Sequence, residues 1–425
     1  IKECDWSSDV CSSDLHIGNA LHRVHHAIDH DRRHLVLFER TRLKDPLERQ
    51  ILGVIRCDLR QRAVPLAHEV ARIRQPILGF FVRVEEPIVG YARYVRLAIW
   101  SATAAPLMEN GEPLDTIKPT MVSANAYLGA DAVAAGLATG ADVVITGRVA
   151  DPSLFVGCML DGLQWRDDDY AKLGQATVAG HLMECAGQVT GGYFADPGFK
   201  DVANLARLGF PICEIHADGA AFITKPEGSG GAVTLATCKE QLLYEVHDPA
   251  RYVTPDCVAD FTGVRFSEKA RDQVAFAGGR AAPRTATYKV SVGYRAGYVG
   301  EGHMTYAGSG ALSRAKLAGD IVRERLALRN IQLEELRVDL IGHSSLHGDV
   351  SPGENAEPYE IRLRVSGRSR NKLDAAAVGE EVQTLYTNGP YGGASDFMQV
   401  KEVVGVRSIL LDRGRIKTEV RMLSL

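Results

Sequence analysis

Three ionisable side chains alternate within one short segment of the sequence, Glu214, His216 and Asp218. Residues 211–216 have the apolar character of a strand, and side chains two positions apart in a strand project from one face. Two carboxylates and one imidazole on the same face could bind a divalent cation. They could also form a general base, in which a neighbouring carboxylate sets the pKa of His216. The simpler alternative is a hydrogen-bonded edge that faces water.

The elements before this segment predict where further polar residues lie. Residues 121–124 and 142–146 are short apolar runs, and residues 131–138 between them have helical spacing. This order is typical of a βαβ unit, whose two strands are parallel neighbours in a sheet. Ligands of such sheets bind beyond the carboxyl ends of the strands. The segment therefore predicts a binding site at the residues that follow each strand.

Asn125, Arg148 and Asp151 are the polar residues at those two strand ends. The guanidinium group of Arg148 could bind a carboxylate through two hydrogen bonds, a geometry that favours arginine. Asp151 would then hold the arginine in place, and Asn125 would contribute to substrate binding. We predict that the three residues form one part of a substrate site.

A glycine-rich turn with a lysine precedes a helix predicted at residues 232–246. Backbone N–H groups at the start of a helix, together with the helix dipole, form a natural anion site. The alternative is a plain helix cap with flexible glycines, which is the commoner use of such a sequence. The anion-binding interpretation assigns the site to Lys225, Gly228, Ser229, Gly230 and Gly231.

A polar stripe lies on the helix predicted at residues 170–189. Its members, at helical spacing, are Thr177, His181, Glu184 and Gln188. We favour a stripe that faces solvent, because charged and polar side chains are mostly exposed. The alternative is that His181 and Glu184 line a cleft as an acid and a base.

The alternation of strands and helices predicts an α/β fold. Over residues 101–330 we expect a mainly parallel sheet with flanking helices, and over residues 331–425 a C-terminal α+β layer. A strand at residues 299–306 would carry Glu301 and His303 on one face. Helical spacing predicts further helices at residues 153–165, 311–326 and 371–386.

The first hundred residues differ in character from the rest. Residues 5–15, DWSSDVCSSDL, correspond to an in-frame translation of a common sequencing-library adapter. Residues 16–100 hold seven of the thirteen histidines and many arginines but a single lysine, Lys44. The spacing of these histidines fits no closed metal site. We interpret residues 1–15 as an adapter artefact and residues 16–100 as foreign or misframed sequence.

Composition excludes several classes of protein. The net charge is −4 and no basic stripe is interleaved with aromatic residues, which argues against nucleic-acid binding. No apolar run reaches the roughly 18 residues of a membrane span. Neither a GxGxxG nor a Walker A pattern occurs, which argues against nicotinamide and ATP cofactors. The cysteines outside the adapter-like segment contain no CxxC pair and indicate reduced thiols in a cytoplasmic protein.

Residues 342–349 bring serine, histidine and aspartate into one loop and invite comparison with a hydrolase triad. Triads join groups that the fold brings together in space, and a single loop seldom has that geometry. The sequence also contains no GxSxG nucleophile elbow. A hydrolase without a metal is therefore the least favoured of the alternatives.

Longer segments of the chain resemble the acyclic terpene utilisation (AtuA) family. The resemblance extends from about residue 101 to the end of the chain, and its motifs occur in the family's order. They are SANAYLGA (123–130), GADVVITGRVADPSL (140–154), GGYFADPG (191–198), SGGAVT (229–234), EQLLYEV (240–246), DPARYVTPD (248–256) and NGPYGGAS (388–395). The glycine-rich strand and turn with which the family opens is not recognisable in this sequence.

The resemblance implies a role in the bacterial breakdown of acyclic terpenes such as citronellol and geraniol. We expect a lyase- or hydratase-type enzyme acting on a branched acid or its coenzyme A thioester. Such chemistry needs a base, a group that holds an enolate or carboxylate, and an anion site. His216, with Glu214 or Asp218, would be the base or metal cluster. The alternative hypothesis is a non-catalytic binding or partner subunit of the same pathway, and a homo-oligomer or a complex with a pathway protein is expected.

Overall fold

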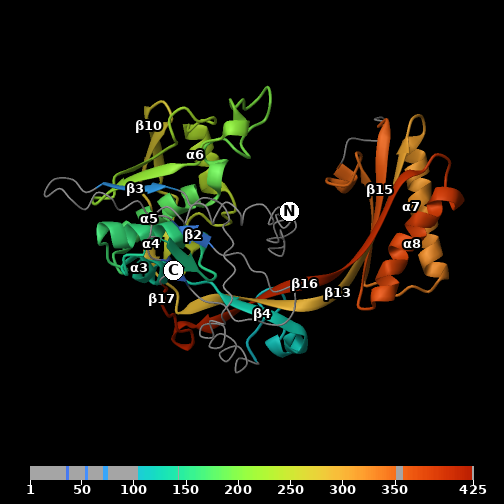
Figure 1. Ribbon diagram of the computed structural model, residues 1–425, viewed down its shortest axis with the longest axis horizontal. Coiled ribbons are helices and arrows are strands. Elements are labelled where there is room, and N and C mark those ends of the chain that lie inside the picture. Colours follow the sequence, from blue (N-terminus) through green and yellow to red (C-terminus); the bar gives the residue numbers. More distant parts are fainter. Residues whose placement is uncertain are drawn as a thin grey trace. The chain divides into compact units, whose positions relative to one another are not determined.

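Figure 1 shows the protein as a computed structural model. The residues that it describes are 104–141, 143–350 and 358–423, together with three short strands, β1 (Leu35–Leu37), β2 (Gly53–Ile55) and β3 (Val70–Arg74). The adapter-like segment at residues 5–15 lies outside the described residues. So does the segment at residues 16–100, apart from the three strands, and the interpretation of both stays a prediction.

The described chain divides into two compact units. Unit 1 contains residues 104–114, 124–291 and 408–423, and unit 2 contains residues 115–123 and 292–407. The boundary expected at residue 330 falls within unit 2, because the strands before and after it belong to one sheet.

Three helices of unit 1 pack side by side, α3 (Ala130–Leu137), α4 (Asp151–Leu163) and α5 (Tyr170–Glu184) (Figure 1). Small residues allow neighbours to approach α5 closely. Gly174 lies against the backbone of Arg280, and a Cβ atom on Gly180 would lie 2.5 Å from the carbonyl oxygen of Pro152. Because Gly180 has no side chain, the first turn of α4 can pack directly against α5.

Unit 1 also contains three small sheets and the helix α6 (Leu235–Leu243). The first sheet has the order β17-β1-β5-β2, the second β10-β11-β7-β6-β3 and the third β12-β9-β8. The strands not yet defined are β5 (Val143–Thr146), β6 (Ile212–His216), β7 (Ala221–Thr224), β8 (Tyr252–Val253), β9 (Cys257–Asp260), β10 (Arg265–Ala270), β11 (Gln273–Ala277), β12 (Arg280–Pro283) and β17 (Met422–Leu423).

The chain is α/β as expected, but its sheets are antiparallel, which corrects the expectation of a mainly parallel sheet. Within the described strands of unit 1, β1 and β5 are the one parallel pair, and every other pair is antiparallel. The predicted βαβ unit fails because β4 (Met121–Ala126) pairs with β13 and not with β5. The two segments meet at a single isolated parallel bridge between Leu128 and Val149.

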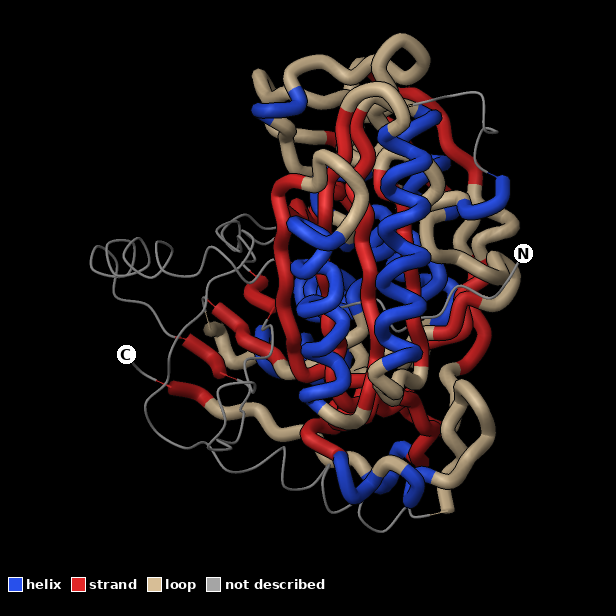
Figure 2. The backbone as a smooth tube through the Cα atoms, turned by 90° about the vertical axis from the view of Figure 1, so that its right-hand side faces the viewer, coloured by secondary structure: helices blue, strands red, loops and turns tan. Residues whose placement is uncertain are grey.

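Unit 2 is an antiparallel sheet covered on one face by two helices. The sheet has the order β14-β15-β13-β16, and its strands are β13 (Thr287–Ala307), β14 (Glu335–Ile341), β15 (Glu360–Ser369) and β16 (Ala394–Asp412). The helices α7 (Ala311–Leu328) and α8 (Lys372–Asn388) pack against each other and against β15 (Figure 2). The strand predicted at 299–306 is part of the long strand β13.

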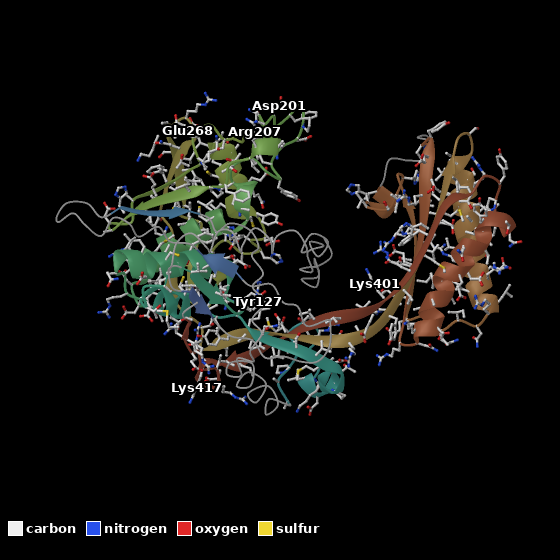
Figure 3. The ribbon with its side chains drawn as sticks, in the orientation of Figure 1. Tyr127, Asp201, Arg207, Glu268, Lys401 and Lys417 are labelled. Carbon is white, nitrogen blue, oxygen red and sulfur yellow. The ribbon has the colours of Figure 1, made fainter. Side chains whose placement is uncertain are left out.

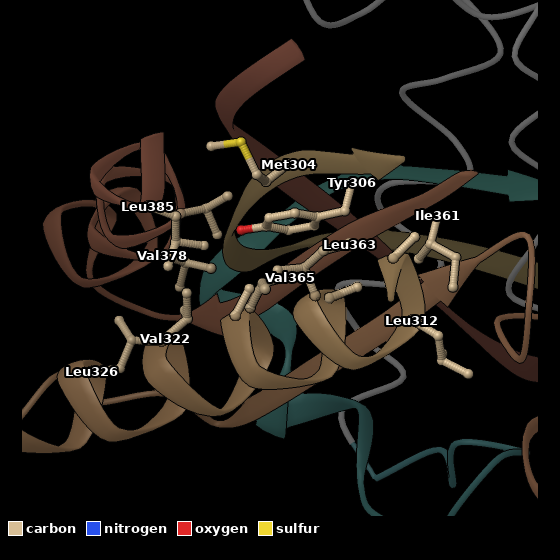
Figure 4. Close-up of a cluster of buried hydrophobic side chains, with 14 of the residues drawn as sticks. Met304, Tyr306, Leu312, Val322, Leu326, Ile361, Leu363, Val365, Val378 and Leu385 are labelled. Atoms are coloured by element: carbon tan, nitrogen blue, oxygen red, sulfur yellow. The ribbon is translucent and has the colours of Figure 1, made fainter. Parts of the chain in front are cut away.

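The core of unit 2 lies between this sheet and its two helices (Figure 4). Alternate residues of β15 enter the core, Ile361, Leu363 and Val365, and all three are fully buried. The residues between them, such as Arg362 and Arg364, project from the opposite face because side chains alternate along a strand. Because side chains alternate along β15, the sheet has one apolar face, which the helices cover, and one polar face.

Short 3-10 helices complete the described chain, at Leu114–Thr116, Lys118–Thr120, Ala186–Gln188, Leu205–Arg207, Gly348–Val350 and Arg413–Arg415. Among the helices that the structure describes, none combines the length and the apolar character that crossing a bilayer requires.

Asp256 ties together the first turns of α3 and α4. Its Oδ1 accepts a hydrogen bond from the backbone N–H of Ala130 at 2.7 Å, and its Oδ2 accepts one from the hydroxyl group of Ser153 at 2.5 Å. The carboxyl group is buried, and neither helix has a capping side chain of its own at its N-cap. Asp256 therefore caps α3 and ties the first turn of α4 to it through the side chain of Ser153.

Replacing Asp256 by alanine leaves two buried donors without an acceptor, and each such loss costs roughly 1–3 kcal/mol. We expect the free energy of unfolding to fall by about 2–4 kcal/mol, measured by urea denaturation. Asp248→Ala is the matched control, because Asp248 accepts a backbone hydrogen bond from Ala250 at an exposed position. Equal losses in the two variants would contradict this role for Asp256.

Candidate active site

The structure separates the three ionisable residues that the sequence placed on one strand face. Glu214 and His216 lie on the same face of β6 and are half-buried. The strand ends at His216, and Asp218 lies in the following turn, where its Oδ1 accepts a hydrogen bond from the N–H of Ala220 at 2.9 Å. Among the described residues, no group of three or more His, Cys, Asp or Glu side chains could hold a metal ion. The predicted metal cluster is therefore not formed by these side chains.

The predicted anion site at the glycine-rich turn is not supported by its geometry. Lys225 donates a hydrogen bond to the carbonyl oxygen of Ser229, and its Nζ lies 3.4 Å from Oδ2 of Asp272. The backbone N–H groups of the turn donate to carbonyl groups of the chain itself, Ser229 to Pro226, Gly230 to Arg207 and Gly231 to Ala203. These groups are thus occupied by internal contacts.

The helix that follows begins later than the sequence predicted, which removes the turn from its N-terminus. Helix α6 starts at Leu235, and Thr234 and Thr237 form a reciprocal capping box there. Gly228 adopts a left-handed backbone conformation with a φ of 73°, which an L-residue seldom takes. The Gly228–Gly231 turn is thus held by internal contacts, and its use as an anion site stays a prediction.

Arg148 and Asp151 come together as the sequence suggested. Nη1 of Arg148 lies 3.3 Å from Oδ1 of Asp151, and Nη2 donates a hydrogen bond to the hydroxyl group of Tyr127 at 2.6 Å. The guanidinium group also lies 4.3 Å from the centre of the Tyr127 ring, and Tyr127 is labelled in Figure 3. Asn125 lies within β4, two residues before Tyr127, and not beyond the end of the strand. A substrate-binding role for these residues stays a prediction.

The polar stripe of α5 faces the interior, which corrects the prediction that it faces solvent. Thr177 and His181 are each 1% exposed, and the Glu184 side chain is 9% exposed. The helix is enclosed because it packs against α4, α6, β9 and β12. We call five residues in and around this stripe the α5 polar cluster: Asp151, His181, Glu184, Gln241 and Tyr252.

His181 and Glu184 form a buried pair at the centre of the cluster. Nδ1 of His181 and Oε1 of Glu184 are 2.7 Å apart, a hydrogen-bond distance. The imidazole ring lies between two aromatic rings, with its centroid 5.2 Å from that of Tyr252 and 5.5 Å from that of Phe261. Gln241 donates a hydrogen bond to the backbone carbonyl of His181 at 3.0 Å. These contacts fix the position of the imidazole ring.

Three buried polar atoms of the cluster have no hydrogen-bond partner within the part of the chain that the structure describes. They are Nε2 of His181, Oε2 of Glu184 and Oε1 of Gln241. A buried polar group without a partner costs roughly 1–3 kcal/mol, so proteins rarely keep several together without a reason. A polar substrate would supply the missing partners.

Burial raises the pKa of the Glu184 carboxyl group above its usual value. The hydrogen bond with His181 opposes this shift, while the negative charges of Asp151 and Glu245 add to it. Burial raises the pKa of Tyr252 as well, and its phenol group stays protonated. Asp151 affects the pKa of Glu184 because the contact between Gly180 and Pro152 places the start of α4 beside this part of α5.

The pair can act as an acid and a base at adjacent positions. The raised pKa makes the protonated form of the Glu184 carboxyl group easier to form than in water, and Oε2 is the oxygen without a partner among the described residues. With Nδ1 of His181 engaged by Oε1 of Glu184, the other ring nitrogen, Nε2, is the one that can meet a substrate. The pair thus contains both kinds of group that general acid–base catalysis uses.

The sequence contained a signal for this pair in the spacing of the stripe, since His181 and Glu184 are three residues apart on one helix face. It contained no signal for the aromatic residues around the pair, because Tyr252 of β8 and Phe261, which follows β9, come from segments far along the chain. The loop with His343 belongs to unit 2, and the side chain of Asp349 lies outside the described residues, so the hydrolase alternative stays a prediction.

The thiol groups near the cluster and elsewhere in unit 1 are unsuited to nucleophilic catalysis. Burial raises the pKa of Cys185 to about 12, of Cys238 to about 12 and of Cys257 to about 11, and it also raises the pKa of Cys213. The thiolate is the reactive form, so each of these thiols is almost fully unreactive at neutral pH.

We expect these four cysteines to resist alkylation in the folded protein. Iodoacetamide at pH 8 should leave them unmodified, and the same treatment in concentrated urea should modify all four, because unfolding restores a pKa near 8.5. Peptide mapping by mass spectrometry measures each site separately. Rapid modification of Cys185 in the native protein would show that its surroundings are open to solvent.

One comparison with known proteins identifies relatives of the chain. A profile of the family described as acyclic terpene utilisation family protein AtuA matches residues 95–422. The match includes every residue of the α5 polar cluster and confirms the resemblance found in the sequence motifs. No curated protein and no solved structure matches the chain.

Proposed function

The chain belongs to the acyclic terpene utilisation family AtuA, and from this premise we propose that it is an enzyme acting on a branched terpenoid acid or its coenzyme A thioester. The proposed reaction adds water to, or removes water from, the carbon chain beside the carbonyl group. The α5 polar cluster is its acid–base centre. The observation that carries the proposal is the buried His181–Glu184 pair with a free position on each partner.

In the direction of water loss, Nε2 of His181 accepts the proton of the carbon next to the carbonyl group. The electron pair left on that carbon forms the new C=C bond, and the C–O bond at the next carbon breaks. The Oε2 proton of Glu184 passes to the departing hydroxyl group, which leaves as water. The pair is then an imidazolium and a carboxylate 2.7 Å apart, each stabilising the charge of the other. After the product leaves, loss of the Nε2 proton to solvent and return of a solvent proton to Oε2 of Glu184 restore the starting state.

Arg148 gives this site a group that could bind the substrate's carboxylate. It is tied to Asp151, and Asp151 is the first residue of α4, whose start lies against α5. A carboxylate bound by Arg148 would therefore lie near the cluster. The site that we now propose replaces the cluster around His216 as the source of the base.

The proposal is tested by incubating the purified protein in D₂O with branched 2-enoyl and 3-hydroxyacyl compounds, as free acids and as coenzyme A thioesters. We expect the substrate to gain or lose the mass of one water molecule and to take up deuterium at the carbon beside the carbonyl group. A protein that binds these compounds, seen as a raised melting temperature, yet changes none of them would support a non-catalytic partner subunit.

A further inference from the structure

The polar face of the unit 2 sheet carries more cations than carboxylates. Arg364 of β15 donates to Oε2 of Glu301 at 2.8 Å and to Oδ2 of Asp339 at 3.1 Å. His303 lies 2.7 Å from Oε1 of Glu301, and Arg337 donates to Oδ1 of Asp339 at 3.2 Å. Both carboxylates are thus engaged by the side chains around them.

Glu301 is held firmly in its charged form. Burial acts to raise its pKa, but hydrogen bonds from Arg364 and His303 outweigh that effect and lower the pKa to about 2. The hydroxyl group of Ser366 also donates to Oε2 at 3.3 Å. The charged Glu301 fixes the orientation of the His303 ring, because it accepts at the ring's Nε2.

Arg362 lies on the same face and has no carboxylate partner among the described residues. Its neighbours across the ladder are Thr305 of β13 and Ile341 of β14, neither of which carries charge. Arg364 and Arg368, on the same face of the same strand, pair with Glu301 and Glu334 respectively. The charge of Arg362 is therefore available to a ligand.

An open pocket of about 360 Å³ lies at this position and is lined by His303, Arg362, Ser395 and Phe397. The Phe397 ring is 46% exposed, and its centroid is 5.2 Å from that of His303. The pocket thus combines a guanidinium group with an imidazole and an apolar wall.

Backbone strain occurs in the wall of the same pocket. Ser395 has a φ of 53°, a left-handed conformation that costs a residue with a Cβ atom of the order of 1–2 kcal/mol. Strained residues persist where the surrounding structure holds them, and they are concentrated at binding sites. The strained residue Ser395 and the charged residue Arg362 thus line the same pocket.

We propose that this pocket of unit 2 binds an oxyanion carried on an apolar or aromatic group, with Arg362 as the residue that binds the anion and Phe397 as the wall for the attached group. A planar guanidinium group matches both carboxylates and phosphates. This choice of ligand rests on the proposed function: the oxyanion is either the carboxylate of a branched acid or a phosphate of coenzyme A. The site belongs to unit 2 and makes no use of the α5 polar cluster in unit 1.

The test is isothermal titration of the full chain with two probes, coenzyme A and citronellate. At least one probe should bind, and Arg362→Gln should weaken that binding roughly 10- to 100-fold, as expected for loss of a charge-assisted contact. Arg368→Gln is the matched control, because Arg368 stands on the same face of the same strand but pairs with Glu334, and it should leave the Kd within about twofold.

The results distinguish a phosphate ligand from a carboxylate ligand. They also distinguish failure of this pocket from failure of the proposed enzyme activity. Binding of coenzyme A assigns the pocket to a phosphate, and binding of citronellate assigns it to a carboxylate. Arg362-dependent binding that persists in His181→Gln supports this site whatever the outcome of the turnover assay. The proposal is overturned if neither probe binds, or if Arg362→Gln binds as tightly as the unaltered protein.

Discussion

His181→Gln should lower turnover of the branched acyl substrate by roughly 100- to 10,000-fold, the range that loss of a general base produces. Glutamine keeps the size and polarity of the side chain but cannot accept a proton at neutral pH. We expect a much smaller effect on the Kd of the substrate than on turnover, because the change removes a proton acceptor and not a binding surface. Single-turnover kinetics combined with titration of the substrate measures the two effects separately.

His216→Gln is the matched control for this prediction. His216 carries the same imidazole group in the same unit, but it lies on β6 and outside the α5 polar cluster. We expect this variant to retain turnover within a few-fold of the unaltered protein. A large loss in His216→Gln together with a mild loss in His181→Gln would return the catalytic base to the strand that the sequence first indicated.

The pH dependence of turnover tests separately whether Glu184, the partner of His181, is the proton donor. Burial raises the pKa of Glu184, and the proposed donor is its protonated form. Turnover should therefore persist as the pH falls below this raised pKa and should decline as the pH rises through it. Glu184→Gln cannot donate in the same way, so its residual activity should lack that decline.

Gly300→Ala should destabilise unit 2 by about 3 kcal/mol or more, which places it among the costliest single substitutions in this part of the chain. Gly300 lies in β13, where the strand contacts α8, and an added Cβ atom would overlap the backbone carbonyl of Ala375. A backbone carbonyl cannot move away as a side chain can, so the helix must shift from the sheet. Urea unfolding followed by circular dichroism measures the loss.

Gly308→Ala is the control for the glycine substitution. A Cβ atom at position 308 would meet nothing within 4 Å, but the residue has a φ of +81°. Its cost is conformational only, roughly 1–2 kcal/mol. If Gly300→Ala proved no more costly than Gly308→Ala, the contact between β13 and α8 would be looser than the structure indicates.

The sequence by itself determined the elements whose pattern is local. The helix predicted at 131–138 is α3, the helix at 311–326 is α7 and the helix at 371–386 is α8, each within two residues at its ends. Helical periodicity depends on residues three and four positions apart, so a single segment contains the whole signal. The contact between Arg148 and Asp151 was predictable for the same reason, since the residues are three apart.

Only the tertiary structure decided which strands pair and which faces are buried. The pairing of β4 with β13 joins segments far apart in the chain, and no local pattern in residues 121–146 encodes that choice. The stripe of His181 and Glu184 was visible as a spacing, but its burial depends on α4, α6 and two strands that close around α5. Burial then turned an ordinary polar stripe into a pair with a shifted pKa, because desolvation acts only where other segments exclude water.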